Sequence, residues 1–357
     1  MTIGTFSENA AMKRVKGLAP HLLAAGHGVT IVAKDTPENR KYFSAIDAEK
    51  VFFSGPGMLQ EIRQKARVLM KRCPDVVYAC GWGLRNGVTL MGNTSIVEHA
   101  EVLSSFPSAE RKAVLRTKDY LMEWISIFVT DGLVLASDHL LKLYQNRDIF
   151  DSVKKLKLPY GVEGFNSAGK KDAVEKGVIN IVYMGTLCAS YGIFDIVDSV
   201  PHVVDADIPV EYVILGDGPE REEAVNRARA LGIEEYIHFE GYVDEDVLEE
   251  RLASADVFLA PMFDTVKDKA RCPSKIPMYM RYRRPIVTCR IGEAGAYLGD
   301  YGFYYDPGQP ESMARQVLKA SRVQGPVDYD LQRISWRNLS ERFLTWLGED
   351  VLPDQKR

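Results

Sequence analysis

Residues 180–192 read NIVYMGTLCASYG, and this stretch decides the fold class. Its opening part, Asn180 to Met184, is apolar and β-branched, which predicts a buried strand that Gly185 ends. Residues 193–202 then carry apolar side chains at helical spacing, and residues 210–215, VEYVIL, predict a second strand. A strand, a helix and another strand in this order form a βαβ unit, in which the two strands run parallel.

The same alternation extends in both directions from this unit. Toward the C-terminus, the sequence predicts a helix at residues 273–283 and further strands at residues 236–239, 256–260 and 285–288. Toward the N-terminus, it predicts a separate series with strands at residues 2–7, 27–33, 75–79 and 133–136. Two such series predict an α/β protein with two doubly wound, Rossmann-like domains, each of which binds ligands at the carboxyl ends of its strands.

The limits of the domains follow from changes in polarity. We place the first domain at residues 1–165 and the second at residues 178–330, because the stretch between them, residues 166–177, is polar enough to be a linker. The tail, residues 331–357, carries Trp and other apolar side chains at helical spacing. This spacing predicts an amphipathic helix that buries its aromatic side chains on another part of the chain.

The composition is that of a globular protein, with 46% hydrophobic and 26% charged residues. No run approaches the ~18 uncharged apolar residues of a membrane span, and we expect no signal peptide. The five cysteines are an odd number without a paired motif, which predicts reduced thiols, a cytoplasmic location and no metal site. The net charge of −4 and the lack of a basic stripe with interleaved aromatic residues predict no nucleic-acid partner.

The charge is uneven along the chain. Residues 1–165 carry 22 Lys and Arg against 17 Asp and Glu, a net charge of +5, which leaves −9 for the remainder. A helix predicted at residues 59–72 places Arg63, Arg67 and Lys71 beside apolar side chains. This pattern is typical of a peripheral contact with the anionic inner face of a membrane or of an anionic acceptor, although an ordinary solvated helix face has the same pattern.

Several segments of the second domain occur in an order that is specific when they are taken together. They are Tyr183-Met-Gly-Thr-Leu187 with Tyr191-Gly192, Ile214-Leu-Gly-Asp-Gly-Pro219, Ala255-Asp-Val-Phe-Leu-Ala-Pro261, Arg271-Cys-Pro-Ser-Lys-Ile276 and Ile291-Gly-Glu293. In this order the sequence resembles the group 1 family of retaining glycosyltransferases. The resemblance implies the GT-B fold, in which two Rossmann-like domains face a cleft and a C-terminal helix crosses back to the first domain.

The resemblance also implies an activity and its site. A sugar would pass from a nucleoside-diphosphate sugar to an acceptor hydroxyl of a glycan, a lipid-linked saccharide or a small molecule, with retention at the anomeric carbon and without a metal or cofactor. The first domain would be the acceptor side, and His99, which follows a short strand, would face the donor sugar unless it is a structural histidine. The remaining implied site residues are Gly185, Thr186, Gly216, Pro261, Met278, Gly292 and Glu293 for the donor, and Asn9, Ala10 and Lys13 on the acceptor side.

Two cations of the family's pattern are missing here. Where the family carries an Arg and a Lys that meet the diphosphate, this sequence has Thr186 and Tyr191. The departing diphosphate accumulates negative charge as the glycosidic bond breaks, so other cations must meet it. We expect Arg271 and Lys275, at the start of the helix predicted over residues 273–283, to supply this charge.

The family's two glutamates are missing as well. Their positions hold Ala270 and Met278, which accept no strong hydrogen bond, and Asp264 or Asp268 is a possible substitute. The sequence therefore leaves two alternatives to an active transferase open. One is an inactive relative that binds sugar nucleotides, and the other is a sugar-nucleotide epimerase or hydrolase on the same fold.

Overall fold

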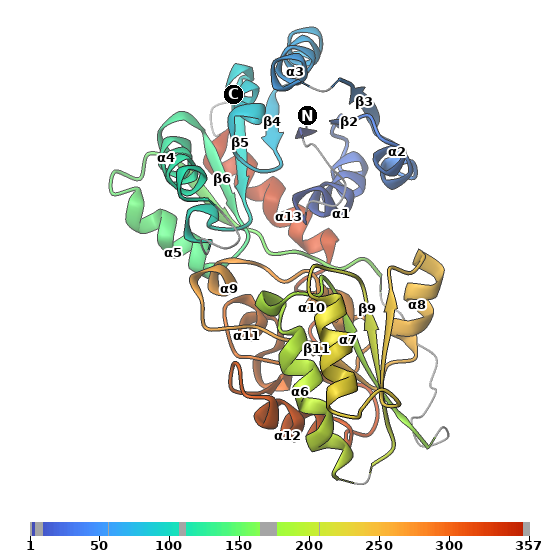
Figure 1. The fold of residues 1–357 in the computed structure, drawn as a ribbon. Helices are drawn as coiled ribbons and strands as arrows, with labels where there is room; N and C mark the ends of the chain where they lie inside the picture. Colours follow the sequence, from blue (N-terminus) through green and yellow to red (C-terminus); the bar gives the residue numbers. More distant parts are fainter. Residues whose placement is uncertain are drawn as a thin grey trace. The chain divides into compact units, whose positions relative to one another are not determined.

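The computed structural model describes residues 2–3, 10–55, 57–106, 112–164, 177–206 and 208–352. They form two α/β units (Figure 1). Unit 1 comprises Met1–Glu163, Lys269–Cys272 and Gln332–Arg357, and unit 2 comprises Gly164–Asp268 and Pro273–Leu331. Most of the predicted linker, residues 166–177, lies outside the described residues.

Unit 1 is built on a parallel sheet whose described strands have the order β3-β2-β1-β4-β5-β6-β7. The chain adds strands on one side of β1 and then crosses to β4 on its other side, so the reversal of direction falls between β1 and β4. Ligands of doubly wound sheets bind at such a reversal, at the carboxyl ends of the strands. The strands are β1 (Thr2–Ile3), β2 (Thr30–Lys34), β3 (Glu49–Phe53), β4 (Val76–Ala79), β5 (Thr94–His99), β6 (Gly132–Leu135) and β7 (Lys154–Lys157).

Helices connect and cover these strands. Local capping fixes where two of them begin, because Thr36 and Ser137 each accept a backbone N–H of the first turn, from Asn39 and Leu140. The described helices of unit 1 are α1 (Ala10–Ala24), α2 (Pro37–Phe43), α3 (Met58–Arg72), η1 (Leu84–Met91), η2 (Leu103–Ser105), α4 (Ala113–Val129), α5 (Asp138–Arg147), α13 (Trp336–Trp346) and η6 (Leu347–Val351).

Unit 2 repeats the same plan with the strand order β10-β9-β8-β11-β12-β13, again parallel throughout, and reverses direction between β8 and β11. Its strands are β8 (Ile179–Met184), β9 (Val210–Leu215), β10 (Ile237–Gly241), β11 (Val257–Ala260), β12 (Ile286–Thr288) and β13 (Phe303–Tyr304). Its helices are η4 (Ala189–Tyr191), α6 (Ile193–Val204), α7 (Arg221–Ala230), α8 (Glu245–Ala253), α10 (Lys275–Met280), α11 (Glu293–Leu298), η5 (Gly299–Tyr301) and α12 (Pro310–Ala320), and α9 (Val266–Ala270) starts in this unit.

The predicted fold class, two doubly wound α/β domains with a helical tail, is confirmed. The tail helix α13 packs against α1 in unit 1 (Figure 1). Its aromatic side chains are buried in that unit. The indole of Trp336 lies where a side chain at Gly17 would be, and the indole of Trp346 lies in the same way against Gly132. The tail is therefore an integral part of the first unit.

Two sequence-based limits differ from the structure. Residues 269–272, placed by sequence in the second domain, belong to unit 1, because Ser137 Oγ donates to the Ala270 carbonyl at 2.6 Å and the Tyr160 N–H donates to Cys272 Sγ at 3.3 Å. The helix predicted at residues 273–283 is shorter and spans Lys275–Met280. Pro273 therefore lies before the helix and not in its first turn.

Candidate functional site

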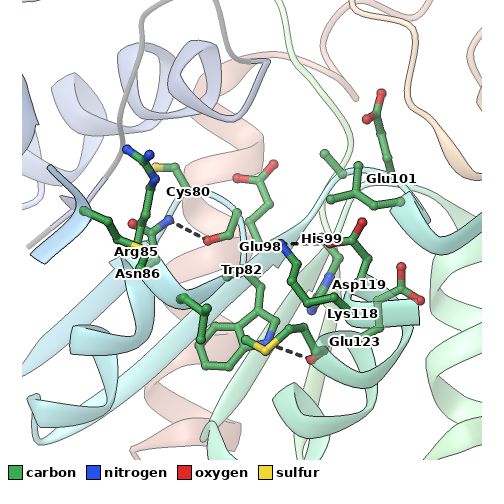
Figure 2. Close-up of a pocket in the computed structure, with 17 residues that line it drawn as sticks. Cys80, Trp82, Arg85, Asn86, Glu98, His99, Glu101, Lys118, Asp119 and Glu123 are labelled. Atoms are coloured by element: carbon green, nitrogen blue, oxygen red, sulfur yellow. Dashed lines mark hydrogen bonds and ion pairs between the residues drawn. The ribbon is translucent and has the colours of Figure 1, made fainter. Parts of the chain in front are cut away.

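Unit 1 contains a cavity of about 380 Å³ at the carboxyl ends of β4 and β5 (Figure 2). Its wall comes from the loop that follows β4, from the end of β5 and from α4. The loop contributes Trp82, whose indole N–H donates to the Met122 carbonyl of α4 at 2.7 Å and so ties these two walls together. The cavity lies beside the reversal of the sheet, where a doubly wound domain is expected to bind a ligand.

His99 forms part of this wall, but both of its ring nitrogens are engaged within unit 1. The Ser126 hydroxyl donates to the Glu123 carbonyl at 2.7 Å, so it accepts from Nε2–H of His99 at 3.0 Å. The other nitrogen, Nδ1, then accepts from the Tyr144 hydroxyl at 3.0 Å. Burial, together with the nearby Arg147 charge, lowers the pKa of His99 to about 3. The ring is therefore neutral and fixed in one tautomer.

Beside His99, Glu98 anchors a buried polar cluster that the sequence did not reveal. Its carboxylate accepts from Arg14 Nε at 2.9 Å and from the Tyr78 hydroxyl at 2.6 Å, and a third donor is Tyr160 at 3.3 Å. Neither charged side chain of this pair is exposed, and the guanidinium also donates to the Pro159 carbonyl. Because a buried charge is costly without its partner, the cluster fixes α1 against β4 and β5.

A second network positions the rim of the cavity. Glu61 of α3 accepts from Lys65 at 2.6 Å and from Arg85 at 2.8 Å. Lys65 is fully buried, which lowers its pKa, and it also donates to Asn86 at 2.9 Å. Asn86 in turn donates to the Gly81 carbonyl. Arg85 keeps half of its side chain exposed. The network thus holds an accessible guanidinium at the mouth of the cavity.

In unit 2, glycines allow the backbone segments at the carboxyl ends of β8 and β9 to approach closely. Gly216 has a φ of +116°, and a side chain there would overlap the Gly185 carbonyl oxygen. A side chain at Gly218 would meet the backbone of Leu187, and one at Gly192, with a φ of +79°, would meet Pro261. These close approaches explain why glycine stands at the turns that follow the strands. They bring the loops after β8, β9 and β11 together.

Two lysines border these loops. Lys275 Nζ lies 4.1 Å above the ring of Tyr183, and a side chain at Gly185 would come within 2.7 Å of the same nitrogen. Lys267 Nζ lies 4.9 Å above the ring of Tyr191 and donates to Ser190 at 3.2 Å. An aromatic ring beneath an ammonium group holds it in place without neutralising its charge. The carboxyl end of β8 is therefore flanked by two cations.

Lys267 was missed in the sequence analysis. It lies eight residues before Lys275 in the short helix α9, which is too short to show a periodicity in the sequence. Only the tertiary structure shows that it reaches Tyr191, where the sequence analysis expected a missing cation. One signal in the sequence could have pointed to Lys267. Tyr191 is aromatic where a cation was expected, and several lysines occur at residues 267–275.

The other residues named from the sequence are distributed over both units. Thr186 and Gly292 are exposed in unit 2, Met278 is partly buried on α10, and Pro261 and Glu293 are buried. Asp268, considered above as a substitute acceptor, is 1% exposed and accepts the Phe263 N–H at 2.6 Å, so it shapes its own loop.

In unit 1, the segment 269–272 holds the buried Ala270 and Arg271. Of the residues expected on the acceptor side, Lys13 is exposed on α1 and Ala10 begins that helix, whereas Asn9 lies outside the described residues.

Metal-binding clusters and membrane spans can be judged only within the described residues. Among them, no three His, Cys, Asp or Glu side chains gather as metal ligands would. In the same part of the chain, no helix combines the length and the apolar character needed to cross a bilayer.

Comparisons with known proteins agree with this architecture. Residues 179–322 match the family described as glycosyl transferases group 1. No curated protein sequence matches the chain. The solved structures that are similar include a glycosyltransferase from Rickettsia africae ESF-5, with a TM-score of 0.68 and 13% identity over 99% of this chain and 95% of that one.

Two further solved structures share the fold at 13% identity. The lipopolysaccharide outer core galactosyltransferase WaaB has a TM-score of 0.66 and is covered to 99%, with 98% of this chain matched. HepE of Anabaena, solved in complex with UDP and glucose, has a TM-score of 0.68, with 97% of this chain and 98% of that one matched. The chain therefore has the GT-B fold, and the resemblance to group 1 glycosyltransferases is confirmed, with residues 179–322 matching the family model.

Proposed function

We propose that the chain is a retaining, metal-independent glycosyltransferase. Unit 2 binds a nucleoside-diphosphate sugar, and unit 1 binds the acceptor whose hydroxyl receives the sugar, in the cytoplasm. The proposal rests on two lysines, Lys267 and Lys275. They lie beside the glycine-containing turns at the carboxyl ends of β8 and β9. HepE, which shares the fold, was solved with UDP and glucose, and this supports a nucleotide-sugar donor.

The two lysines suit the chemistry of the departing diphosphate. Negative charge grows on the leaving oxygen as the glycosidic bond breaks, and fixed cations stabilise that charge. Lys275 takes the place of the cation missing at Thr186, and Lys267 takes the place of the one missing at Tyr191. Arg271, which was expected from the sequence to supply this charge as well, belongs to unit 1 and is buried there.

We assign the other donor residues expected from the sequence to the same site in unit 2. Gly185, Thr186 and Gly216 border the diphosphate, and Gly292 and Glu293 complete the site with Pro261 and Met278. Since Ala270 is fully buried and Met278 carries no acceptor, the sugar and ribose hydroxyls are held by other groups than the family's two glutamates.

In unit 1, the cavity beside His99 is the proposed acceptor site. Its volume is in the range of sites for small polar ligands, and its mouth carries the Arg85 guanidinium. His99 itself is neutral and internally bonded, so it acts by positioning Ser126, Tyr144 and α4 around the cavity. His99 transfers no proton to or from the acceptor, because both of its ring nitrogens are engaged.

The lysines are tested by donor binding. The full-length chain is titrated calorimetrically with UDP-, GDP- and dTDP-sugars, and the best donor is then measured with Lys267→Met and Lys275→Met. Each charge-assisted contact with a phosphate contributes about 1.5–3 kcal/mol, so each substitution is expected to weaken binding roughly tenfold to a hundredfold. Lys319→Met, an exposed lysine on α12, is the matched control and should bind the donor as the unaltered chain does.

Turnover is measured separately, with enzyme in excess over donor and with a glycan or lipid extract as acceptor. Retention is read from the anomeric configuration of the product by NMR, and metal independence from activity in the presence of a chelator. Unchanged affinity in both lysine variants would remove the diphosphate assignment. Donor binding without transfer or hydrolysis for any sugar would contradict the transferase.

A further inference from the structure

Helix α4 presents its polar side to the interior of unit 1 and its apolar side to solvent. Asp119, Glu123 and Ser126 point inward and are buried. On the opposite side, Val114 is 80% exposed and Phe128 is 61% exposed. Between these two on the same side lie Leu121 and Ile125, both also exposed. This is the reverse of an ordinary surface helix, whose apolar stripe faces the core.

The inward polar side is fully engaged, which shows that the orientation of α4 is fixed by its own contacts. Glu123 accepts from the N–H and the hydroxyl of Ser104 at 3.1 and 2.8 Å, and from Arg147 at 3.1 Å. Ser126 joins His99 in the network described above. Rotating the helix to bury the apolar stripe would break all of these bonds. The hydrogen bonds of the inward side chains thus keep the apolar stripe exposed to solvent.

Other apolar side chains extend the stripe. Ile149 and Phe150 are 77% and 78% exposed, and they follow Arg147, whose guanidinium lies 5.4 Å from the ring centre of Tyr120 on α4. Single exposed apolar residues are common, but several on the outward side of one helix indicate a binding surface.

Cations accompany the stripe at the N-terminal end of α4. Lys112 and Lys118 are exposed there, and Arg85 lies at the mouth of the same cavity as Lys118 (Figure 2). Apolar side chains flanked by cations are what an anionic bilayer surface binds, since acyl chains take up the former and headgroups pair with the latter. A two-fold contact with a second copy would instead bring two cationic surfaces together.

We propose that unit 1 docks on an anionic lipid bilayer through the outward face of α4, formed by Val114, Leu121, Ile125 and Phe128 and extended by Ile149 and Phe150. The helix lies in the plane of the headgroup layer, with its apolar stripe toward the acyl chains. The polar cavity on the inner side of α4 then opens next to the membrane surface. The proposal does not depend on sugar transfer, because it concerns binding to lipid alone.

The test is sedimentation of the full-length chain with vesicles of phosphatidylcholine containing phosphatidylglycerol, compared with vesicles of phosphatidylcholine alone. The unaltered chain is expected to bind the anionic vesicles, and added salt should weaken this binding. Leu121→Gln together with Phe128→Gln should reduce the bound fraction at least tenfold, because both side chains leave the acyl region. Lys112→Gln should weaken binding only to the anionic vesicles.

The control variant carries Leu231→Gln and Tyr242→Gln, which remove two exposed apolar side chains of unit 2 and should bind vesicles normally. Thermal unfolding followed by tryptophan fluorescence, which reports on unit 1, and by circular dichroism, which reports on the whole chain, verifies that each variant is folded. Equal vesicle binding by the α4 variant and the unaltered chain would overturn the proposal. So would a chain that ignores vesicles and forms a dimer that the α4 substitutions dissociate, since the occupant would then be a second copy.

Discussion

At the scale of single residues, the buried titratable groups of unit 1 matter more for stability and positioning than for proton transfer. Glu98 holds Arg14 and two tyrosine hydroxyls, and burial raises the pKa of both Tyr78 and Tyr160 well above their usual range. His99 is held neutral in the same region. Neither the two tyrosines nor His99 exchanges a proton near neutral pH in the folded chain. The influence of His99 appears when the protein is taken to lower pH, because its pKa is lowered in the folded chain.

The pH dependence of His99 can be measured directly. Its pKa is about 3 in the folded chain and near 6.5 when exposed. Between these values the unfolded chain binds a proton that the folded chain refuses, so the free energy of unfolding decreases as the pH falls below 6.5. Between pH 7 and pH 5 we expect a loss of about 2 kcal/mol from this group.

Urea unfolding followed by tryptophan fluorescence is the measurement, because all four Trp residues of the chain, at positions 82, 124, 336 and 346, belong to unit 1. His99→Asn, which cannot titrate, is the reference: its stability should fall by about 2 kcal/mol less over the same pH interval. Identical pH dependence of the two proteins would show that His99 is accessible to protons in the folded state.

At the scale of elements, the close fit between α1 and α13 decides how the tail is held. Gly17 lies in the middle of α1, where Ala would ordinarily favour the helix by roughly 0.5–1 kcal/mol. Here the indole of Trp336 occupies the space that a side chain would need. The packing between the helices thus depends on the absence of one methyl group.

Gly17→Ala is therefore expected to destabilise unit 1 by about 1–3 kcal/mol, the usual cost of an overpacked contact, despite its better helix propensity. Tryptophan-detected unfolding measures the loss, and Gly28→Ala, where nothing lies within 4 Å of an added side chain, should change little. Adding Trp336→Leu to Gly17→Ala should recover part of the loss if the ring causes it. A stabilised Gly17→Ala protein would contradict this account of the packing.

At the scale of the whole molecule, the tail belongs to unit 1 although it follows unit 2 in the sequence. Trp336, Phe343 and Trp346 are all buried, and losing one such aromatic side chain from a core costs about 3–5 kcal/mol. The two units therefore depend on the C-terminus to different degrees.

Ending the chain after Leu331 should leave unit 2 folded and unfold or loosen unit 1. Hydrogen exchange measured by mass spectrometry should show lost protection in β4 and β5 and retained protection in β9 and β11. Donor binding, which we assign to unit 2, serves as the internal control and should persist. Equal loss of protection in both units would contradict the assignment of the tail to unit 1 alone.

The sequence alone determined the architecture, because βαβ periodicity is local. The run at residues 180–215 shows both strand and helix spacing, and the sheets follow from the rule that such crossovers are right-handed and parallel. The order of motifs also revealed the resemblance to group 1 glycosyltransferases. Such local patterns can be recognised in a single sequence, because each depends on residues within about one helical turn or one strand.

The site and its surfaces were decided by tertiary structure. Lys267 meets Tyr191 across a gap of many residues, and Arg14 meets Glu98 in the same way, so no local spacing could have paired them. In α4 the spacing of apolar residues predicts a helix but not which face turns inward. That face was set by Glu123 and Ser126, whose hydrogen bonds to Arg147, Ser104 and His99 outweigh the burial of an apolar stripe.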